Sequence, residues 1–492
     1  MKFKGLLLVI SLILCILFSI SCVAASDVND TVTSANEVTE DGNGDVLATS
    51  QDDLLLDSDD GTFTALQKKI NNASVGDIIT LERDYTYNEG FSDAGIVIAK
   101  SLTINGNGHT LNGLSNSRIF FITPGLINNN KVTLNDINLK NGNAEIYGGA
   151  ILNFANLTIN NCAFTNNHAG TAGGAINSLG WLNANNCIFY KNSADGSAGA
   201  MFSLSIESVN FFDEFDKDII GENLTKAILA KLISEIDLNI KFGKEYVYNC
   251  TFTKNSANAN GGALYAFTNI DITSCTFNSN KAGEKGGAVF GNMDLYITNS
   301  KFNSNTVSLY GGAVYFKCHE QSGSYINGTW TPKIVYYSNL IQGSTFTKNS
   351  ASKGGAIYGF RHSDSDKIHC AKAVKCTFTD NKAQTGRDIY GGTTSNCVFN
   401  YLKLTLNTVS VKKSANKLVL TAALKKGTTL ISGKQITFKF NGKTYKAKTN
   451  TKGVAKVTIG KNILKKLKVG ATIKYQAKYS SLSVTKTAVV KK

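Results

Sequence analysis

Residues 250–274 read CTFTKNSANANGGALYAFTNIDITS, and residues 275–299 read CTFNSNKAGEKGGAVFGNMDLYITN. Both stretches are 25 residues long and match position by position: Cys, Phe two residues later, Asn five later, Ala seven later, then Gly-Gly-Ala. The same unit begins at Cys162 and, with Ser in place of Cys, at Ser300. A fixed period of this length is typical of a repeat protein whose units stack on one another.

Each unit contains three short segments in which apolar and polar residues alternate, as in Leu157-x-Ile159, Cys162-x-Phe164 and the segment that begins at Ala175. Because successive side chains of a β-strand point to opposite faces, each segment places its apolar residues on one face. Three strands per turn predict a coil whose turns stack about 4.8 Å apart, with equivalent side chains in internal ladders. A leucine-rich repeat has a similar period, but its Leu-x-x-Leu-x-Leu signature is absent. The repeat therefore predicts an all-β solenoid of the parallel β-helix type.

Two further positions recur as predicted ladders. An Asn follows each Phe at the next bend, where its amide can bond backbone groups of its own and of neighbouring turns. A Cys begins most units, and Ser300 and Ser344 replace it in two others. This exchange indicates a demand for a small side chain, so we predict mainly stacked thiols. The Asn ladder comprises Asn167, Asn192, Asn255, Asn280, Asn305, Asn349 and Asn381, and the Cys ladder comprises Cys162, Cys187, Cys250, Cys275, Cys376 and Cys397.

Phe-x-x-Asn followed by Gly-Gly-Ala resembles the repeat of chlamydial polymorphic outer-membrane proteins and of archaeal adhesin-like surface proteins. The resemblance covers residues 61–400, and it implies a right-handed parallel β-helix with an adhesin-like function. The last copy departs from the pattern, because Asn381 is followed by Gly386-Arg387-Asp388 instead of Gly-Gly-Ala. Such degeneration is expected of a terminal turn.

The N-terminal segment has the features of an export signal. Lys2 and Lys4 precede an apolar run over residues 6–20, and Val23-Ala24-Ala25 follows, which predicts a secretory signal over residues 1–25. Residues 26–60 contain 11 acidic and no basic residues and predict a disordered acidic spacer. No other apolar run is long enough to span a bilayer, so we expect no transmembrane segment after signal cleavage. We expect the mature protein to be secreted and retained at the cell surface or wall.

Residues 61–400 form the predicted β-helix. Phe63, Leu66 and Ile70 have helical spacing and predict a short helix that caps the first turn. Two insertions interrupt the period, near residues 203–246 and 317–340, and the first contains apolar residues at helical spacing over 224–236. Loops on such scaffolds often carry binding sites.

Residues 401–492 contain 22 Lys and no acidic residue. Alternating segments around an Asn441-Gly442 turn predict a small β-sandwich. The pattern of residues 433–440 and 449–455 resembles the Ig-like modules of archaeal and bacterial surface adhesins, although it lacks cysteine. The positive field predicts salt-dependent binding of polyanions, whereas a purely solubilising surface is the alternative. Nucleic acid is not an expected partner, because the chain is exported and lacks an aromatic-basic reading surface.

A group of possible metal ligands surrounds the second insertion. His319 and His362 each lie six residues after a Gly-Gly-Ala, so equivalent positions on neighbouring turns would bring their imidazoles together. The hypothesis is a divalent metal site with ligands drawn from His319, His362, Asp364, Asp366 and His369. Their spacing matches no established metal motif. Cys318 and Cys370 form a separate possible pair.

The fold alone does not decide the function, since β-helices also carry polysaccharide lyases and hydrolases. Those reactions need paired carboxylates, or a calcium cluster with a basic residue, projecting from adjacent turns. The outward strand positions show mainly Thr, Asn, Ser and Lys, so we predict no catalytic residue and no cofactor. We expect an adhesin-like protein that binds glycans, cell-wall polymers or surface proteins of the same or another cell. The alternative is a β-helix polysaccharide lyase or glycan-modifying hydrolase.

Overall fold

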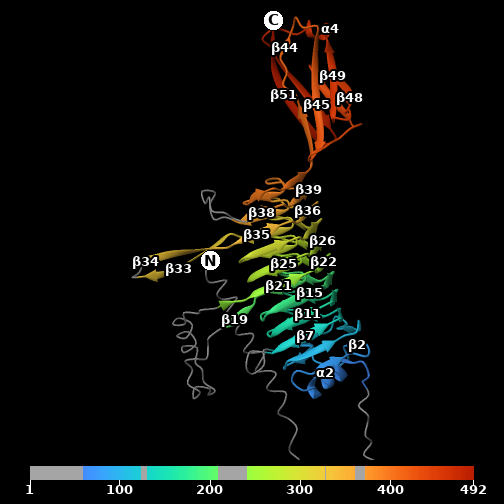
Figure 1. The fold of residues 1–492 in the computed structure, drawn as a ribbon, viewed down its shortest axis with the longest axis vertical. Helices are drawn as coiled ribbons and strands as arrows, with labels where there is room; N and C mark the ends of the chain where they lie inside the picture. Colours follow the sequence, from blue (N-terminus) through green and yellow to red (C-terminus); the bar gives the residue numbers. More distant parts are fainter. Residues whose placement is uncertain (1–58, 124–129, 209–240, 327–328, 361–371) are drawn as a thin grey trace, which may run out of the picture. The chain divides into compact units, whose positions relative to one another are not determined.

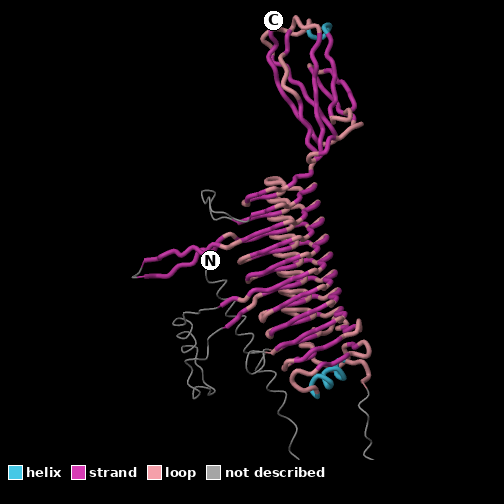
Figure 2. The backbone as a smooth tube through the Cα atoms, viewed as in Figure 1, coloured by secondary structure: helices cyan, strands magenta, loops and turns pink. Residues whose placement is uncertain are grey.

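The structure is a computed structural model of the 492-residue chain, and it describes residues 59–123, 130–208, 241–326, 329–360 and 372–492. Three long parallel sheets run side by side up a coil, with one strand of each sheet in every turn (Figures 1 and 2). We call one turn of the coil a rung. The fold class is the one that the repeat predicts, a parallel β-helix.

Along each rung the chain passes through sheet 1, then sheet 3, then sheet 2, and returns to sheet 1 on the next rung. Sheet 1 consists of β1 (Ile78–Thr80), β4 (Leu102–Asn105), β7 (Lys131–Asn135), β11 (Asn156–Asn160), β15 (Leu182–Asn185), β21 (Lys244–Tyr248), β25 (Asn269–Thr273), β29 (Leu295–Thr298), β35 (Asn339–Gln342), β38 (Lys372–Val374) and β41 (Thr393–Ser395). Sheet 2 consists of β3 (Ile96–Ile98), β6 (Phe120–Ile122), β10 (Ile151–Asn153), β14 (Ile176–Ser178), β18 (Met201–Ser203), β24 (Leu264–Ala266), β28 (Val289–Gly291), β32 (Val314–Lys317), β37 (Ile357–Phe360) and β40 (Ile389–Tyr390). Sheet 3 consists of β2 (Tyr85–Thr86), β5 (Thr110–Asn112), β8 (Asn138–Lys140), β12 (Ala163–Thr165), β16 (Ile188–Tyr190), β22 (Thr251–Thr253), β26 (Thr276–Asn278), β30 (Lys301–Asn303), β36 (Thr345–Thr347), β39 (Thr377–Thr379) and β42 (Val398–Asn400).

A short fourth sheet corrects the expectation of three strands per turn. After the ladder Asn, the chain pairs for two residues with the rungs above and below, so that the bend is itself hydrogen-bonded. Sheet 4 consists of β9 (Asn143–Ala144), β13 (His168–Ala169), β17 (Ser193–Ala194), β23 (Ser256–Ala257), β27 (Lys281–Ala282) and β31 (Thr306–Val307). Two residues are too few to show an alternating pattern, which is why the sequence does not reveal this strand.

The interior of the coil is a set of stacked ladders. The ladder Phe rings lie parallel to one another, with centroids 4.6 to 5.2 Å apart from Phe164 to Phe399. This distance is close to the strand spacing of a β-sheet, so identical rings on successive rungs stack without adjustment. Aliphatic residues of sheets 1 and 2 fill the rest of the core.

The ladder Asn residues are fully buried, and their amides bond from rung to rung. Asn255 Nδ2 donates to Phe189 O and to Asn280 Oδ1, each at 3.0 Å. Asn255 Oδ1 accepts from the backbone N–H and from Nδ2 of Asn192, again at 3.0 Å. Both N–H donors and both acceptor sites of this amide are thereby matched inside the protein, and the column of amides links neighbouring rungs.

The Cys ladder consists of free thiols in this structure. Cys250 Sγ accepts a hydrogen bond from Cys187 N–H of the preceding rung at 3.3 Å, and Cys275 Sγ accepts one from Cys250 N–H at 3.4 Å. Where Ser300 stands in the ladder, its Oγ accepts from Cys275 N–H at 3.1 Å in the same way. The position therefore needs a small acceptor, which explains the exchange of Cys and Ser in the sequence.

The Gly-Gly pair is required at a corner of the coil. Gly173 has a φ of +69°, a conformation that favours glycine. A Cβ on Gly174 would lie 2.2 Å from Gly199 O of the next rung, so the backbones approach too closely for any side chain.

The N-terminal end of the coil carries the predicted helix. Helix α2 (Phe63–Asn72) begins after Thr62, whose side chain accepts a hydrogen bond from Ala65 N–H. Phe63, Leu66 and Ile70 are buried in the same core as the first rungs.

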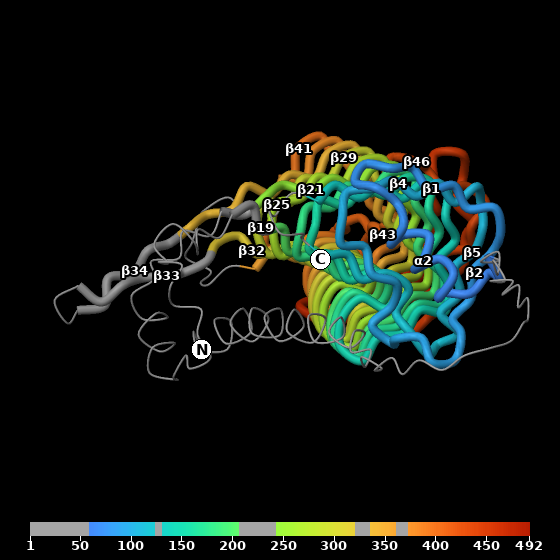
Figure 3. The backbone as a smooth tube through the Cα atoms, turned by 90° about the horizontal axis from the view of Figure 1, so that it is seen from below, coloured from blue at the N-terminus to red at the C-terminus, as the bar shows by residue number. Residues whose placement is uncertain are grey.

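Both insertions leave the coil between sheet 2 and sheet 1. The first begins with β19 (Ile206–Ser208) and returns with β20 (Lys241–Phe242), which pair antiparallel. The predicted helical positions over residues 224–236 lie outside the described residues. The second forms an antiparallel hairpin of β33 (His319–Ile326) and β34 (Thr329–Tyr336), which projects from the coil (Figures 1 and 3). Despite the first insertion, β15 and β21 stay in register, with Asn183 opposite Tyr246.

The C-terminal domain begins directly after the last strand of sheet 3 and has its own hydrophobic core. One of its sheets contains β43 (Leu402–Leu406), β45 (Lys417–Lys426), β46 (Thr429–Leu430) and β49 (Val454–Gly460), and helix α4 (Lys461–Leu464) follows β49. The other contains, in order, β44 (Val411–Lys412), β51 (Leu482–Lys491), β50 (Thr472–Tyr479), β47 (Gln435–Phe440) and β48 (Lys443–Lys448). Neighbouring strands in both sheets of this domain are antiparallel, except that β44 is parallel to β51. The predicted Asn441-Gly442 turn joins β47 to β48, and both residues have a positive φ.

Candidate functional site

The outward face of sheet 1 changes character along the coil. At the central outward position, the early rungs carry Thr103, Thr133, Thr158 and Asn183, which are aligned by the strand register. The next three rungs carry Tyr246, Asp271 and Tyr296 at the same position. The rungs after them carry Leu340, Lys372 and Thr393. Strands β21, β25 and β29 therefore replace a plain hydroxyl and amide surface with rings and charge.

Lys244 completes this group of side chains. Its Nζ lies 2.9 Å from Asp271 Oδ2 and 5.6 and 5.2 Å from the ring centroids of Tyr246 and Tyr296. The hydrogen bond to Asp271 raises the pKa of Lys244 above its ordinary value. A carboxylate with an aromatic ring on each side is a favourable setting for an ammonium group. We call Lys244, Tyr246, Asp271 and Tyr296 the sheet 1 cluster.

One acceptor in the sheet 1 cluster has no donor. Asp271 Oδ1 is buried and has no hydrogen-bond partner among the described residues, although Oδ2 is bound to Lys244. An ionised carboxylate can accept about four hydrogen bonds. The free oxygen is therefore an unsatisfied acceptor at the floor of the cluster, where a ligand could supply the donor.

Exposed aromatic side chains surround the cluster. Tyr246 is 44% exposed and Tyr248, two residues later on the same strand, is 50% exposed. Trp181 is 36% exposed, and a Cβ on Gly243 would lie 2.7 Å from its Nε1, so the indole lies against bare backbone next to Lys244. Exposed rings of this number are uncommon on a polar sheet face and indicate a contact surface.

Sheet 2 also carries outward aromatic rings, but these are arranged differently. Successive rings stack on each other with centroids 4.4 to 5.4 Å apart. Each ring face is therefore covered by its neighbour, and Phe290, Tyr315 and Tyr358 are buried. In the sheet 1 cluster the two tyrosines are two rungs apart, about 9.6 Å by strand spacing, with Asp271 between them. The stacked column of sheet 2 consists of Phe202, Tyr265, Phe290, Tyr315, Tyr358 and Tyr390.

The two insertions bracket the rungs of the sheet 1 cluster. The first insertion returns to the coil at β20, directly before β21. The second leaves after β32 and returns directly before β35. In Figure 1, β19 and the β33–β34 hairpin both leave the coil toward the left of the view. Ser338 N–H, just after the hairpin, donates to Asp294 Oδ1 beside β29 at 2.7 Å. The insertions thus flank the one stretch of the described sheet 1 face where Tyr and Asp replace Thr and Asn.

A buried carboxyl group lies behind the cluster. Glu245 points into the coil between Lys244 and Tyr246, at the position that Ile270 takes on the next rung. It is 1% exposed, and neither of its carboxyl oxygens has a hydrogen-bond partner among the described residues. Burial raises the pKa of Glu245 well above its ordinary value. The hydroxyls of Ser203 and Ser205, at the same corner of the coil, are likewise buried without partners.

The predicted metal ligands are only partly described. His319 is the first residue of β33, is 9% exposed, and its ring centroid lies 6.1 Å from that of Tyr336 on β34. His362, Asp364, Asp366 and His369 lie outside the described residues. Within the part of the chain that the structure describes, no three His, Cys, Asp or Glu side chains gather as a metal site would need. The metal hypothesis therefore stays a prediction.

Cys318 is disulfide-bonded in the structure, which separates it from the thiols of the Cys ladder. Cys370, which the sequence suggests as its partner, lies outside the described residues.

The C-terminal domain presents a second candidate surface. On its five-stranded sheet, Lys439, Lys446, Lys474 and Lys478 are exposed on one face. Thr437 stands between Lys446 and Lys478 in the strand register, and Lys439 stands between Thr444 and Gln476. None of these four lysines is directly opposite another, which limits their repulsion while the positive field is kept. We call these four lysines the lysine face.

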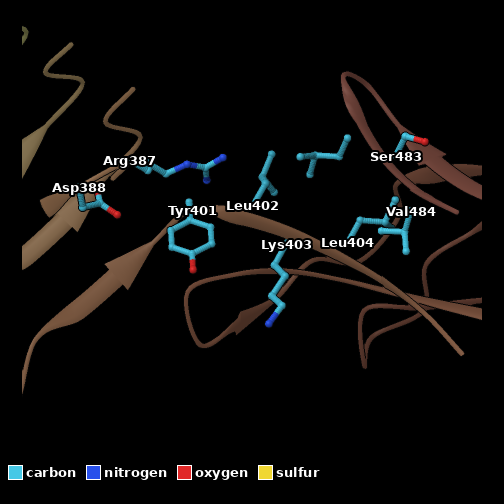
Figure 4. A pocket seen from close by; sticks show the side chains of 9 residues that line it. Arg387, Asp388, Tyr401, Leu402, Lys403, Leu404, Ser483 and Val484 are labelled. Atoms are coloured by element: carbon cyan, nitrogen blue, oxygen red, sulfur yellow. The ribbon is translucent and has the colours of Figure 1, made fainter. Parts of the chain in front are cut away.

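A small open pocket lies near the start of the C-terminal domain and has a volume of about 300 Å³ (Figure 4). Its lining includes Tyr401, Leu402 and Leu404, and the Arg387 guanidinium lies 4.8 Å from the ring centroid of Tyr401. Asp388, also in the lining, already accepts a hydrogen bond from Asn381 Nδ2. We assign this pocket no function.

A comparison with known protein families supports the repeat. Residues 249–266, 274–292 and 343–359 match the Chlamydia polymorphic membrane protein repeat. The chlamydial part of the resemblance is thereby confirmed for these segments. Among solved structures, the chain is similar to the A-module of the mannuronan C-5 epimerase AlgE6 from Azotobacter vinelandii, with 12% sequence identity and a TM-score of 0.36. That comparison covers 69% of this chain and 95% of the other, and we draw no functional argument from it. No curated protein matches this chain.

No membrane-spanning helix is found in the described part of the chain, where no helix has both the length and the apolar composition that crossing a bilayer requires.

The sequence contains a signal for the sheet 1 cluster that our reading of the outward positions missed. Tyr246, Asp271 and Tyr296 each lie four residues before the small ladder residue of their unit. The same position holds Thr158 and Asn183 in the earlier units, so aligning the units exposes the change. Lys244 gives no such signal, because its contact with Asp271 depends on which way the two side chains lean across neighbouring strands.

Proposed function

We propose that this chain is a secreted, cell-surface adhesin-like protein that binds glycans or surface proteins through its β-helix and does not catalyse a reaction. The matched repeat supports this proposal, because it is named for membrane proteins of Chlamydia. The observation that carries it is the outward face of sheet 1, where exposed rings and an ion pair interrupt a long polar surface between two insertions. Flat strand faces of this kind suit many weak contacts with an extended ligand.

The lysine-rich domain has a separate part in the proposal, which is electrostatic retention on polyanions. Its 22 Lys have no acidic residue to oppose them within residues 401–492. A field of this sign attracts acidic polysaccharides or anionic lipid headgroups and weakens as salt is added. We also propose that this domain is related to the Ig-like modules of surface adhesins.

The second candidate function is that of a glycan-modifying β-helix enzyme. The Lys244–Asp271 pair on the outer face is the observation that favours it, since a base and an acid are adjacent. Hydrolases, however, place two carboxyl groups on opposite sides of the bond that breaks. Here Asp271 is bound to Lys244, and Asp294 on the same face accepts a hydrogen bond from Ser338 N–H. This arrangement supports binding more than turnover.

One experiment separates the two candidates. Purified full-length protein is incubated with intact cells and with immobilised neutral and acidic polysaccharides, and both bound protein and released product are measured. The adhesin proposal predicts retention without any change in the mass or linkage of the glycan. Time-dependent release of shortened, unsaturated or epimerised fragments would establish the enzyme instead, and failure to bind any cell or polysaccharide would refute the adhesin.

A further inference from the structure

We propose that the sheet 1 cluster is a binding subsite for a neutral pyranose unit of a glycan. The inference rests on the proposed function and gives that function a place and a ligand chemistry. It depends on three features of the described face: the exposed ring of Tyr246 with the partly buried ring of Tyr296 two rungs away, one unsatisfied acceptor, and one ammonium group held in position.

The rings supply the stacking surfaces. Tyr246 and Tyr296 are separated by one intervening strand, so neither covers the other, in contrast to the stacked column of sheet 2. Tyr246 is 44% exposed, and Trp181 lies near Gly243, directly before the first residue of β21. The C–H face of a pyranose ring is apolar and packs against exposed aromatic rings in the way that an apolar side chain does.

The carboxylate selects a donor. Asp271 Oδ1 is a buried acceptor without a partner among the described residues, and sugar hydroxyl groups are donors. Lys244 uses one of its three N–H bonds on Asp271 Oδ2 and has others for the ring or hydroxyl oxygens of the same sugar. Asn183, opposite Tyr246 on β15, adds an amide that both donates and accepts.

The charges argue for a neutral sugar rather than a uronic acid. The ion pair of Lys244 with Asp271 has no net charge, and the free oxygen belongs to the negative partner. A sugar carboxylate at this place would meet the Asp271 carboxylate and would have to take Lys244 from it. Acidic glycans are therefore directed to the lysine face, and neutral ones to the sheet 1 cluster.

The test measures binding of the full-length protein to neutral hexasaccharides of glucose, mannose, galactose and N-acetylglucosamine, and to hexamers of galacturonate and mannuronate. We expect at least one neutral hexasaccharide to bind at low and at high salt. Asp271→Asn should weaken that binding at least about tenfold, because it removes a charge-assisted acceptor. For a uronate held at this place, the same change would strengthen binding, so the direction of the effect identifies the ligand class.

Two further variants report on the rings. Tyr246→Ala should weaken binding of the neutral sugar by a similar factor, whereas Tyr246→Phe, which keeps the ring, should retain it. The matched control is Tyr190→Ala on sheet 3, where a tyrosine also has two lysine Nζ atoms within 6 Å of its ring centroid but belongs to no such carboxylate cluster. All variants change outward strand positions, and their thermal unfolding is compared with that of the unaltered protein.

The possible outcomes are distinct. If the protein binds cells or polysaccharides but the Tyr246 and Asp271 variants bind neutral sugars unchanged, the subsite is refuted while the proposed function stands. If the protein binds no cell and no glycan, both are refuted. If only a lysine-rich peptide binds, and Tyr246→Ala abolishes it, the occupant is a basic protein segment and the sugar subsite is wrong.

Discussion

The sheet 1 cluster and the lysine face are both flat strand surfaces, yet their charged side chains are arranged in opposite ways. The first holds one ammonium group and one carboxylate in contact between two tyrosine rings, and one oxygen of that carboxylate is buried without a partner among the described residues. The second spreads exposed lysines among Thr and Gln without any acidic partner in its domain. A fixed cluster recognises the shape and donors of one ligand, whereas a field of like charges recognises only the sign of the ligand.

The largest effect that we predict concerns the interior that holds the first surface flat. Asn255→Ala removes four hydrogen bonds of the Asn ladder and leaves buried partners on Asn192, Phe189 and Asn280 unsatisfied. We expect a loss of about 3 kcal/mol in the unfolding free energy of the β-helix. Chemical denaturation followed by circular dichroism measures it. Polyanion binding by the lysine face should survive, because that domain has a separate core.

The control for this variant is Asn258→Ala, three residues along the same rung, where the side chain is exposed. It should change the unfolding free energy by no more than about 0.5 kcal/mol. Equal losses for the two variants would show that the Asn ladder contributes no more than a surface amide.

The next effect concerns Glu245, on the inner side of the strand that carries Lys244 and Tyr246. Its pKa in the folded protein lies well above the ordinary value of 4.5, so the folded state is more stable when this carboxyl group is protonated than when it is ionised. That contribution is complete below about pH 4.5 and is lost as the pH rises toward the folded pKa. Glu245→Leu, which restores the aliphatic ladder, should stabilise the β-helix at pH 7 by about 2 kcal/mol.

Unfolding measured at pH 4 and at pH 7 checks this prediction. The stability gain of Glu245→Leu should be larger at pH 7, and Glu245→Gln should also remove most of the pH dependence while gaining less at either pH. A gain of the same size at both pH values would contradict the assignment of the pH dependence to this carboxyl group.

A smaller effect tests the lysine face directly. Changing Lys439, Lys446, Lys474 and Lys478 together to Gln should weaken binding of polygalacturonate about tenfold, at about 0.4 kcal/mol for each exposed charge. Neutral hexasaccharide binding should not change. The measurement is a titration at low salt, repeated at high salt, where the difference between the proteins should shrink.

The control removes the same charge from the β-helix, by changing the exposed Lys191, Lys254, Lys301 and Lys348 to Gln. This variant should retain most polygalacturonate binding. An equal loss in both variants would mean that net charge alone, and not the lysine face, determines retention.

The smallest effect concerns the Cys ladder. Cys250→Ser should cost less than about 1 kcal/mol, since a hydroxyl at this position can accept the hydrogen bond from Cys187 N–H. Ser300 already makes the equivalent contact on another rung. Thermal unfolding measures the change, and a loss several times larger would show that the sulfur packing itself is required.

Much of the fold can be read from single residues of the repeat. Phe63, Leu66 and Ile70 specify a buried helix face, Asn255 and its equivalents specify the amide column, and the Gly-Gly pair specifies a corner. These features are local or repeat with a fixed period, so the strand periodicity alone places them. The two-residue strands of sheet 4 escape prediction because they are too short to alternate.

The candidate site was harder to predict for a different reason. Tyr246, Asp271 and Tyr296 share one position of the repeat, but Lys244, which binds Asp271, occupies another, and only side-chain geometry joins them. For the metal candidates, the place of a residue in the repeat does not determine its place in the structure. His319 begins a hairpin that leaves the coil and does not continue a rung.

The sequence by itself determined the coil, its ladders, its cap and the charge of its last domain, because these follow from periodicity and composition. The tertiary structure decided which outward residues meet. Residues 63 positions apart, such as Asn183 and Tyr246, become neighbours because the first insertion leaves and returns at one corner without changing the register. The pairing of β21 with β25 and of β25 with β29 places the Lys244–Asp271 ion pair between two tyrosine rings and leaves one oxygen of Asp271 in need of a donor.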